Sequence, residues 1–455
     1  MLGAGSPSTP ARPTAASAAQ RGGAVVRAAR WIITLLFFVA GSALACARLT
    51  PETRNTVWAE DGRFFLEDEF NHGPIGSLFL DYSGYLHVVP RMVISFATHA
   101  APIDRFAVTV TVLCALVVGA VCAGVYVLTE DVLRSVAVRL VLAALPALLP
   151  LAPVEIAGNT ANLHTYLLFL APFVFIAPVR SWARSVVLAV VALLSGLTEI
   201  QILAFLPLLL LQIRMPKKWP IVAGALLGVG AQVLTTIVYP RRTLPDVGHG
   251  RFSDIAVGFF LEPFAGSGTW DIASVAGVVA DSGLVVLIVP FAVVLAVVVV
   301  GMWLGTARHR ILLGAMVWGA GVVWAVSVYV NAVPVLAFAH FTESELRSIS
   351  TFRYAAASSL FIIAGVLVVA DVLVGRRGIL LKGVGALLTL VVVVVFAINF
   401  SVPETSRQHG PVWDQQVDQA EDDCELHPRQ NAVIQVAPSG PNWATTVPCK
   451  LVLDR

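Results

Sequence analysis

The chain has 455 residues, of which 57% are hydrophobic and 13% charged, and its mean hydropathy is +0.83. These values lie far outside the range of soluble globular domains. Apolar runs of about 18 residues or more recur, each long enough to cross a bilayer as a helix. They lack the alternation that membrane β-strands require. The composition therefore predicts an all-α polytopic membrane protein.

The first 30 residues are rich in Ala, Ser, Pro and Gly and carry four arginines but no acid. This pattern predicts a disordered cytoplasmic tail. An apolar run over 31–47 follows, and Ala43-Leu44-Ala45 within it weakly resembles a signal-peptidase site, so a cleaved signal peptide is the alternative. Because further spans follow, we expect an uncleaved signal anchor. The scarcity of Lys among the basic residues is typical of a GC-rich bacterial genome.

Eleven transmembrane spans are expected in a domain covering 31–400. Residues 84–101 are also apolar, but Pro90, Arg91 and His99 interrupt them, so we expect a helix lying in the membrane interface. Residues 185–213 are too long for one span and are expected to form two short helices with Glu199 at the turn. The predicted spans are 31–47, 106–128, 138–153, 163–178, 185–199, 200–213, 219–239, 277–304, 311–330, 355–374 and 382–400.

Charge fixes the expected orientation, because basic loops stay in the cytoplasm. The segments predicted to lie inside contain only three acids, Glu130, Asp131 and Asp371. The N-terminus is therefore expected inside the cytoplasmic membrane and the C-terminus outside. The bases in the inner segments are Arg12, Arg21, Arg27, Arg30, Arg134, Arg139, Arg180, Arg184, Arg214, Lys217, Lys218, Arg308, Arg310, Arg376, Arg377 and Lys382.

The outer side then consists of the first loop, two later loops, a short turn and the C-terminal tail, 401–455. Cys424 and Cys449 both lie in this tail. Two cysteines in an oxidising compartment are expected to form a disulfide that closes a small domain. His427 is the only other metal-ligand type close by, which does not indicate a metal site. The outer loops and turn are 48–105, 240–276, 331–354 and 154–162.

Polar residues are concentrated in the first outer loop. Glu60 and Asp61 follow Trp58 and precede Phe64-Phe65. A carboxylate that acts as a general base must reach a hydroxyl and be shielded from bulk water, and these aromatic residues could provide the shielding. The alternative is an ordinary acidic loop, as Glu67, Asp68 and Glu69 nearby suggest.

The layout and several short motifs resemble the GT-C glycosyltransferases. The resemblance covers about residues 31–400: a short inner N-terminus, one span, a long first outer loop containing an acid, an interfacial helix and many short-looped spans. The motifs that carry it are Trp58-Ala59-Glu60-Asp61-Gly62, Gly84-Tyr85, Pro90-Arg91 and, at the outer start of a late span, Arg353-Tyr354.

The resemblance implies an enzyme that transfers a sugar, with inversion, from a polyprenyl-phosphate donor to a cell-envelope glycan or glycolipid on the outer face. The general base maps best onto Asp61, with Glu60 second, because here the two acids are adjacent. Arabinofuranose and mannose are the usual donor sugars in actinobacteria. Some members use a divalent metal, but no acidic pair here has diagnostic spacing, so we expect no metal or other cofactor and no nucleic-acid partner.

The residues themselves agree with a leaving group that is a lipid phosphate. Arginine binds phosphate as a bidentate fork, and the outer side retains arginines despite the positive-inside bias. Candidates for phosphate binding are Arg353, Arg241, Arg242, Arg91 and His87, the last two four residues apart. The alternative role for each is contact with ordinary headgroups at the interface.

Polar groups at the membrane edge are candidates for sugar or acceptor binding. Each has a structural alternative, namely helix capping, a solvated turn or an interfacial aromatic anchor. The candidates are Trp58, Tyr85, Glu155, Asn159, Asn162, His164, Glu199 and Tyr354.

Two other functions fit parts of the pattern. A transporter or flippase would need polar groups near mid-membrane in several spans, and 106–128, 219–239, 277–304 and 382–400 contain almost none. A polymerase or ligase of surface polysaccharide would share the outer arginines but usually has its main outer loop late in the chain.

Overall fold

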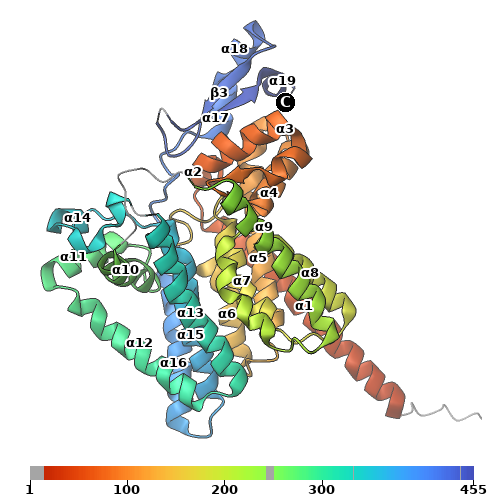
Figure 1. Ribbon diagram of the computed structural model, residues 1–455, viewed down its shortest axis with the longest axis vertical. Helices are drawn as coiled ribbons and strands as arrows, with labels where there is room; N and C mark the ends of the chain where they lie inside the picture. The colour runs from red at the N-terminus through yellow and green to blue at the C-terminus, as the bar shows by residue number, and fades with distance from the viewer. Residues whose placement is uncertain (1–14, 242–250, 332, 441, 455) are drawn as a thin grey trace, which may run out of the picture.

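The computed structural model describes residues 15–241, 251–331, 333–440 and 442–454, which are mostly helical (Figure 1). Among them, seven helices are long and apolar enough to cross a membrane: α1 (Ala15–Ala47), α5 (Phe106–Leu128), α9 (Trp219–Val238), α12 (Val285–Leu304), α13 (Ala307–Val330), α15 (Arg353–Val374) and α16 (Ile379–Ile398). Shorter apolar helices are α6 (Val136–Leu148), α7 (Leu163–Ile176), α8 (Trp182–Gly196), η4 (Ile200–Leu210) and α11 (Ile272–Ser282).

Two helices organise the bundle. α15 is buried along most of its length and packs against α6, α7, α12, α13 and α16. α1 lies along α5, where Gly119 allows close approach: a Cβ there would lie 2.1 Å from Ser42 Oγ and 2.3 Å from the carbonyl oxygen of Phe38. Without hydrophobic force between helices in lipid, such small-residue contacts provide the packing.

The span expected over 277–304 is wrong at its start. Helix α11 ends at Ser282, and α12 begins only at Val285 after a break at Gly283, whose φ of 77° ends the helix. The pair expected over 185–213 is present as α8 and η4, with Glu199 between them. η4 is a 3-10 helix, so its 11 residues extend about 22 Å instead of the roughly 17 Å of an α-helix.

The expected first loop, 48–105, is largely folded. The helix expected over 84–101 is present as α4 (Val88–Ala100). It begins later than expected because 81–86 form a hairpin before it. Its buried face carries Arg91, Ile94 and Ala97, and Phe96 is exposed. The other elements are α2 (Pro51–Arg54), the π-helix η1 (Asp61–Leu66), α3 (Glu67–Gly76), η2 (Ser77–Phe79), β1 (Asp81–Tyr82), β2 (Tyr85–Leu86) and η3 (Ile103–Arg105).

The remaining connections are also short helices. Those beside α11 and before α15 are α10 (Phe252–Phe259), the π-helix η6 (Phe260–Phe264), η7 (Pro334–Leu336), η8 (Phe338–His340) and α14 (Glu343–Arg347), and η5 (Pro216–Lys218) precedes α9. α11 packs against α14, and α10 packs against α13 and η8. This group lies at the same level as the start of α15 (Figure 1).

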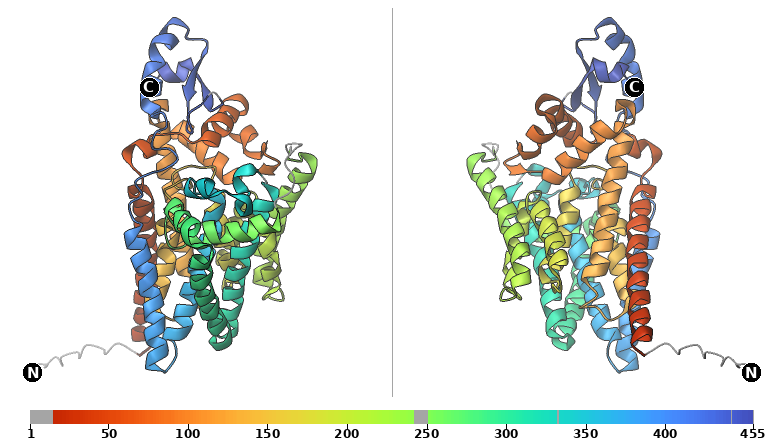
Figure 2. Two further views of the ribbon diagram at one scale, coloured as in Figure 1. Left: turned by 90° about the vertical axis from the view of Figure 1, so that its left-hand side faces the viewer. Right: turned by 90° about the vertical axis from the view of Figure 1, so that its right-hand side faces the viewer.

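A small C-terminal subdomain, residues 401–454, stands beyond the helix ends, above α3 and α4 (Figure 2). Strands β3 (Asn431–Gln435) and β4 (Ala444–Pro448) pair antiparallel beside α17 (Trp413–Gln419), α18 (Glu421–Leu426) and α19 (Cys449–Leu453). Cys424 and Cys449 are disulfide-bonded, which confirms the predicted pair. We call this side the loop-rich end.

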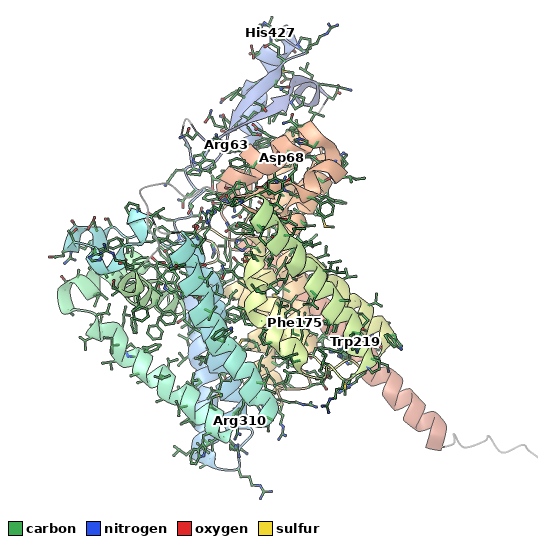
Figure 3. All side chains as sticks on the ribbon, in the orientation of Figure 1. Arg63, Asp68, Phe175, Trp219, Arg310 and His427 are labelled. Carbon is green, nitrogen blue, oxygen red and sulfur yellow. A yellow bond between two sulfur atoms is a disulfide. The ribbon has the colours of Figure 1, made fainter. Side chains whose placement is uncertain are left out.

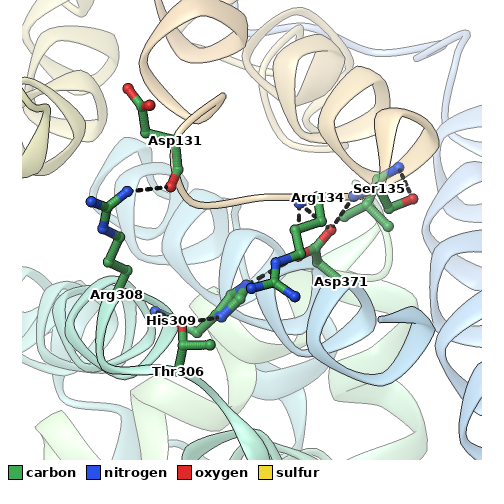
Figure 4. A network of polar contacts seen from close by, with 8 residues as sticks. Asp131, Arg134, Ser135, Thr306, Arg308, His309 and Asp371 are labelled. Carbon is green, nitrogen blue, oxygen red and sulfur yellow. Dashed lines mark hydrogen bonds and ion pairs between the residues drawn. The ribbon is translucent and has the colours of Figure 1, made fainter. Parts of the chain in front are cut away.

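Polar contacts gather several connections at the opposite end, which we call the basic end (Figure 4). Asp371 of α15 accepts hydrogen bonds from the backbone N–H groups of Arg134 and Ser135 and contacts His309 Nε2 at 3.0 Å. Arg308 donates to the carbonyl oxygen of Asp131 at 2.9 Å. These connections are among those predicted to lie on one side of the membrane.

The disulfide gives a stability prediction. Replacing Cys424 by Ser opens a loop of sequence separation 25, which by loop entropy costs the subdomain about 3 kcal/mol. We expect residues 401–454 to become sensitive to limited proteolysis at a lower temperature. Cys46→Ser, at a free cysteine in α1, is the control. Equal protease resistance of all three proteins would contradict the prediction.

Candidate active site

A cavity of about 500 Å³ lies at the loop-rich end, between the first-loop hairpin and helices α7, η4, α13 and α15. One part is polar, and the other is apolar. Its polar lining is Glu60, Tyr82, Ser83, Tyr85, His87, His164, Thr165, Glu199, Gln201, Thr236, Arg241, Ser327, Asn331, Arg353 and Tyr354. Its other lining residues are Gly84, Ala161, Leu168, Ile200, Leu203, Ala204, Val322, Val323, Val326, Val330 and Ala357.

An arginine between two acids forms the centre of the polar part. Arg353 Nη1 donates to Glu60 Oε1 at 2.8 Å, and the backbone N–H of Arg353 donates to Glu155 Oε2 at 3.1 Å. Burial raises the pKa of Glu155, against the opposing effect of Arg353. Glu60 Oε2 is buried and accepts no hydrogen bond from the described residues. Glu60 therefore offers one carboxylate oxygen for a further polar group.

Asp61, the acid that the sequence favoured as general base, does not line this cavity. Its oxygens accept hydrogen bonds from Thr160 N at 2.7 Å, Thr160 Oγ1 at 2.8 Å and Ala161 N at 2.9 Å. Burial raises its pKa to about 6, while these donors oppose the shift. Since neighbouring side chains on a helix do not face the same way, only Glu60 points to the cavity. In this structure the Asp61 carboxylate instead joins the first loop to the turn at 160–161.

A second polar pair lines the cavity. His164 Nδ1 contacts Glu199 Oε2, and Glu199 Oε1 accepts from the backbone N–H of Gln201 at 2.8 Å, which caps η4. The His87 ring lies 6.4 Å from that of His164 and 4.2 Å from that of Tyr85. Burial, together with His164, lowers the pKa of His87 well below its ordinary value, so His87 is a neutral group here.

Other expected site residues have structural contacts away from the cavity. Arg91 pairs with Asp68 at 2.8 Å and lies over the Phe65 ring at 4.8 Å. Figure 3 places Asp68 at the loop-rich end.

Asn159 Oδ1 accepts hydrogen bonds from both the backbone and side-chain nitrogens of Asn162 at the start of α7. Trp58 is buried and bridges to Ala437 of the C-terminal subdomain. Arg242 lies outside the described residues.

Some lining residues were not singled out from the sequence. Gln201 Nε2 donates to Ser327 Oγ at 3.1 Å, and Asn331 follows one turn later on the same face. Ser327 and Asn331 are four residues apart at one end of the apolar stretch 311–330, and this spacing could have identified them from the sequence. Tyr82 lies on the same hairpin as the Gly84-Tyr85 motif but is not part of that motif, so the motif did not predict it.

The apolar part of the cavity is lined by side chains that are not packed away. Leu203 of η4 and Val326 of α13 both line the cavity, and they are 50% and 42% exposed. Space for an apolar group therefore adjoins the polar part. A molecule with a polar head and an apolar chain could occupy both parts at once.

The C-terminal subdomain fixes the segment that carries Glu60. The buried Arg407 guanidinium donates to the carbonyl oxygens of Thr56 at 3.1 Å and Gly158 at 3.0 Å. Ala437 N donates to Val57 O at 3.0 Å. Segments 55–62 and 154–161 are thus tied to each other and to the subdomain.

Comparisons with known proteins return no match: no family model fits the chain, and no curated protein or solved structure is significantly similar to it. Among the described residues, no group of three or more His, Cys, Asp or Glu side chains is arranged to hold a metal ion. The chemistry of the cavity must therefore be inferred from its own geometry.

The different surroundings of the two acids give a prediction. Asp61→Asn places an amide NH₂ among three donors and should cost about 1–3 kcal/mol, so we expect a lower Tm in thermal unfolding. Glu60→Gln should leave Tm closer to that of the wild type, because one oxygen of Glu60 has no partner to lose. Glu52→Gln, at an exposed acid in α2, is the control. An unchanged Tm for Asp61→Asn would contradict the structural role.

Proposed function

We propose that the protein is an inverting glycosyltransferase that moves a sugar from a polyprenyl-phosphate donor to a cell-envelope glycan or glycolipid. One observation carries the proposal: an acid and an arginine, Glu60 and Arg353, face each other in a cavity whose remaining lining is largely apolar. A lipid-linked sugar phosphate has the same division into a polar head and an apolar chain.

In the proposed reaction Glu60, rather than Asp61, is the general base. Its unpartnered Oε2 accepts the proton of the acceptor hydroxyl, whose oxygen attacks the anomeric carbon of the donor sugar. The bond from that carbon to the phosphate oxygen breaks, and its electron pair leaves with the lipid phosphate. Displacement from the opposite face inverts the anomeric centre.

The leaving phosphate requires positive charge at a fixed position. Arg353 is placed for this, since Glu60 and Glu155 orient it, and Arg241 lines the same cavity. His164, oriented by Glu199, adds a ring nitrogen for a phosphate oxygen or a sugar hydroxyl. Tyr85 and Tyr354 supply aromatic surface beside these groups.

Eleven helices are proposed to cross the membrane in a GT-C-like arrangement. The rich supply of arginines at the basic end supports placing that end in the cytoplasm, which puts the cavity on the outer face of the cytoplasmic membrane. The crossing helices are α1, α5, α6, α7, α8, η4, α9, α12, α13, α15 and α16.

A transporter is the less well supported alternative. The cavity is lined by residues near the loop-rich end and contains none of the basic-end residues Asp131, Arg134, His309 and Asp371. Within the part of the chain that the structure describes, the lining of this cavity therefore forms no polar path between the two ends.

The first functional prediction concerns Glu60. With purified protein and polyprenyl-phosphate-linked arabinofuranose or mannose, Glu60→Gln should lower transfer by about 100-fold or more while donor binding persists. Glu52→Gln is the exposed-acid control. Full transfer by Glu60→Gln would refute this base, and donor-independent counterflow in liposomes would favour transport.

The second concerns the apolar part of the cavity. Val326→Trp should fill this part and raise the KM for a long-chain donor more than for a short-chain analogue, because only the long chain needs that space. Val317→Trp, on the same helix at an exposed position outside the cavity, is the matched control. Equal effects on both donors would contradict binding of the lipid chain in this part of the cavity.

A further inference from the structure

A run of aromatic and guanidinium surfaces leads from the cavity to the C-terminal subdomain. Tyr82 lines the cavity, and the Phe64 ring lies 4.8 Å from it. The Arg63 guanidinium lies 5.6 Å from the Phe64 ring and 5.8 Å from the Trp443 ring. We call these four residues, Tyr82, Phe64, Arg63 and Trp443, the aromatic track.

Three different segments supply the aromatic track, and a hydrogen bond joins two of them. Tyr82 belongs to β1, Phe64 and Arg63 belong to η1, and Trp443 directly precedes β4. Thr445 Oγ1 donates to the carbonyl oxygen of Gly62 at 2.9 Å, next to Arg63 in the chain. Figure 3 places Arg63 at the junction of the subdomain and the helices below it.

All four side chains of the aromatic track are partly exposed, neither buried as core nor fully solvated. The three aromatic side chains pack against the hydrophobic core with part of their surface and leave the rest exposed. Because neighbouring members of the track are in contact, these exposed parts follow one another from the cavity to the subdomain.

We propose that the aromatic track binds sugar units of a glycan acceptor, beyond the unit that reacts at Glu60. The C–H face of a sugar ring packs on an aromatic face, and a guanidinium donates hydrogen bonds to hydroxyl groups in a fixed fork. This inference rests on the proposed transferase function and narrows its acceptor. A single sugar or a short glycolipid headgroup would not reach Trp443.

Charge favours a neutral glycan over an anionic polymer. Asp81 and Glu67 lie beside the track: Asp81 precedes Tyr82, and Glu67 Oε1 accepts from Thr446 N at 2.9 Å. These acids offset Arg63, so the surface has little attraction for a chain of phosphates or carboxylates. An acyl chain is also disfavoured, because it would cover the Arg63 guanidinium without pairing it.

The test compares acceptor lengths in wild type and variants. Linear disaccharides and hexasaccharides of α-linked mannose and of α-linked arabinofuranose serve as acceptors. We expect the wild-type KM to be about tenfold lower for the hexasaccharide of the accepted sugar than for its disaccharide. Trp443→Ala and Arg63→Gln should remove this advantage, and Trp443→Phe should restore most of it. Leu426→Ala, at an exposed apolar residue of α18, is the control.

Calorimetric binding of the same hexasaccharides separates this inference from the transferase proposal. Loss of binding in Trp443→Ala and Arg63→Gln supports the track even if no donor yields transfer, in which case the proposed reaction alone fails. Transfer with a KM independent of acceptor length, and equal in wild type and both variants, overturns the track while the transferase stands.

Discussion

The site depends on how one short segment is fixed between two others. Residues 55–62 lie against the turn 154–161, and both lie against the C-terminal subdomain. Asp61 accepts three hydrogen bonds from Thr160 and Ala161, and the Arg407 guanidinium spans the carbonyl oxygens of both segments. A buried carboxylate and a buried guanidinium are each expensive unless their polar atoms are paired. These pairings hold the backbone on either side of Glu60 in place.

Arg353, the partner of Glu60, is also held by several contacts. Arg353 is the first residue of α15, the helix that packs against most of the bundle. At the start of this helix, two acids accept hydrogen bonds from backbone N–H groups. Glu155 accepts from Arg353 N, and Glu262 accepts from Phe352 N at 3.2 Å. Burial, together with nearby Glu155, raises the pKa of Glu262 well above its ordinary value. The guanidinium is thus presented to the cavity from a helix that is buried along most of its length.

The sequence predicted a helical membrane protein and most of its helices, because hydrophobic length and charge placement are local properties. Eight of the candidate site residues, from segments far apart in the sequence, line one cavity: Glu60, Tyr85, His87, His164, Glu199, Arg241, Arg353 and Tyr354. Because Glu60 and Asp61 are adjacent, the sequence alone could not show which of them faces the cavity. That depends on the N–H groups of a turn about 100 residues later, which donate to Asp61. Arg407 could not be found either, since nothing in the tail indicates which carbonyl oxygens it will meet. The residues Asp281-Ser282-Gly283 could have indicated the helix break at Gly283, but the predicted span followed the length of the apolar run instead.

The position of Arg407 has a consequence for how the protein is made. The chain emerges from the ribosome N-terminus first, so residues 55–62 are synthesised and placed long before 401–454 exist. Until the subdomain folds, the carbonyl oxygens of Thr56 and Gly158 lack their guanidinium donor, and the strand contact at Trp58 lacks Ala437. A segment translated about 350 residues later therefore completes the geometry of one translated early. A polypeptide that stalls or is cut before residue 401 would lack these contacts, and the segment that carries Glu60 would be left without part of its support.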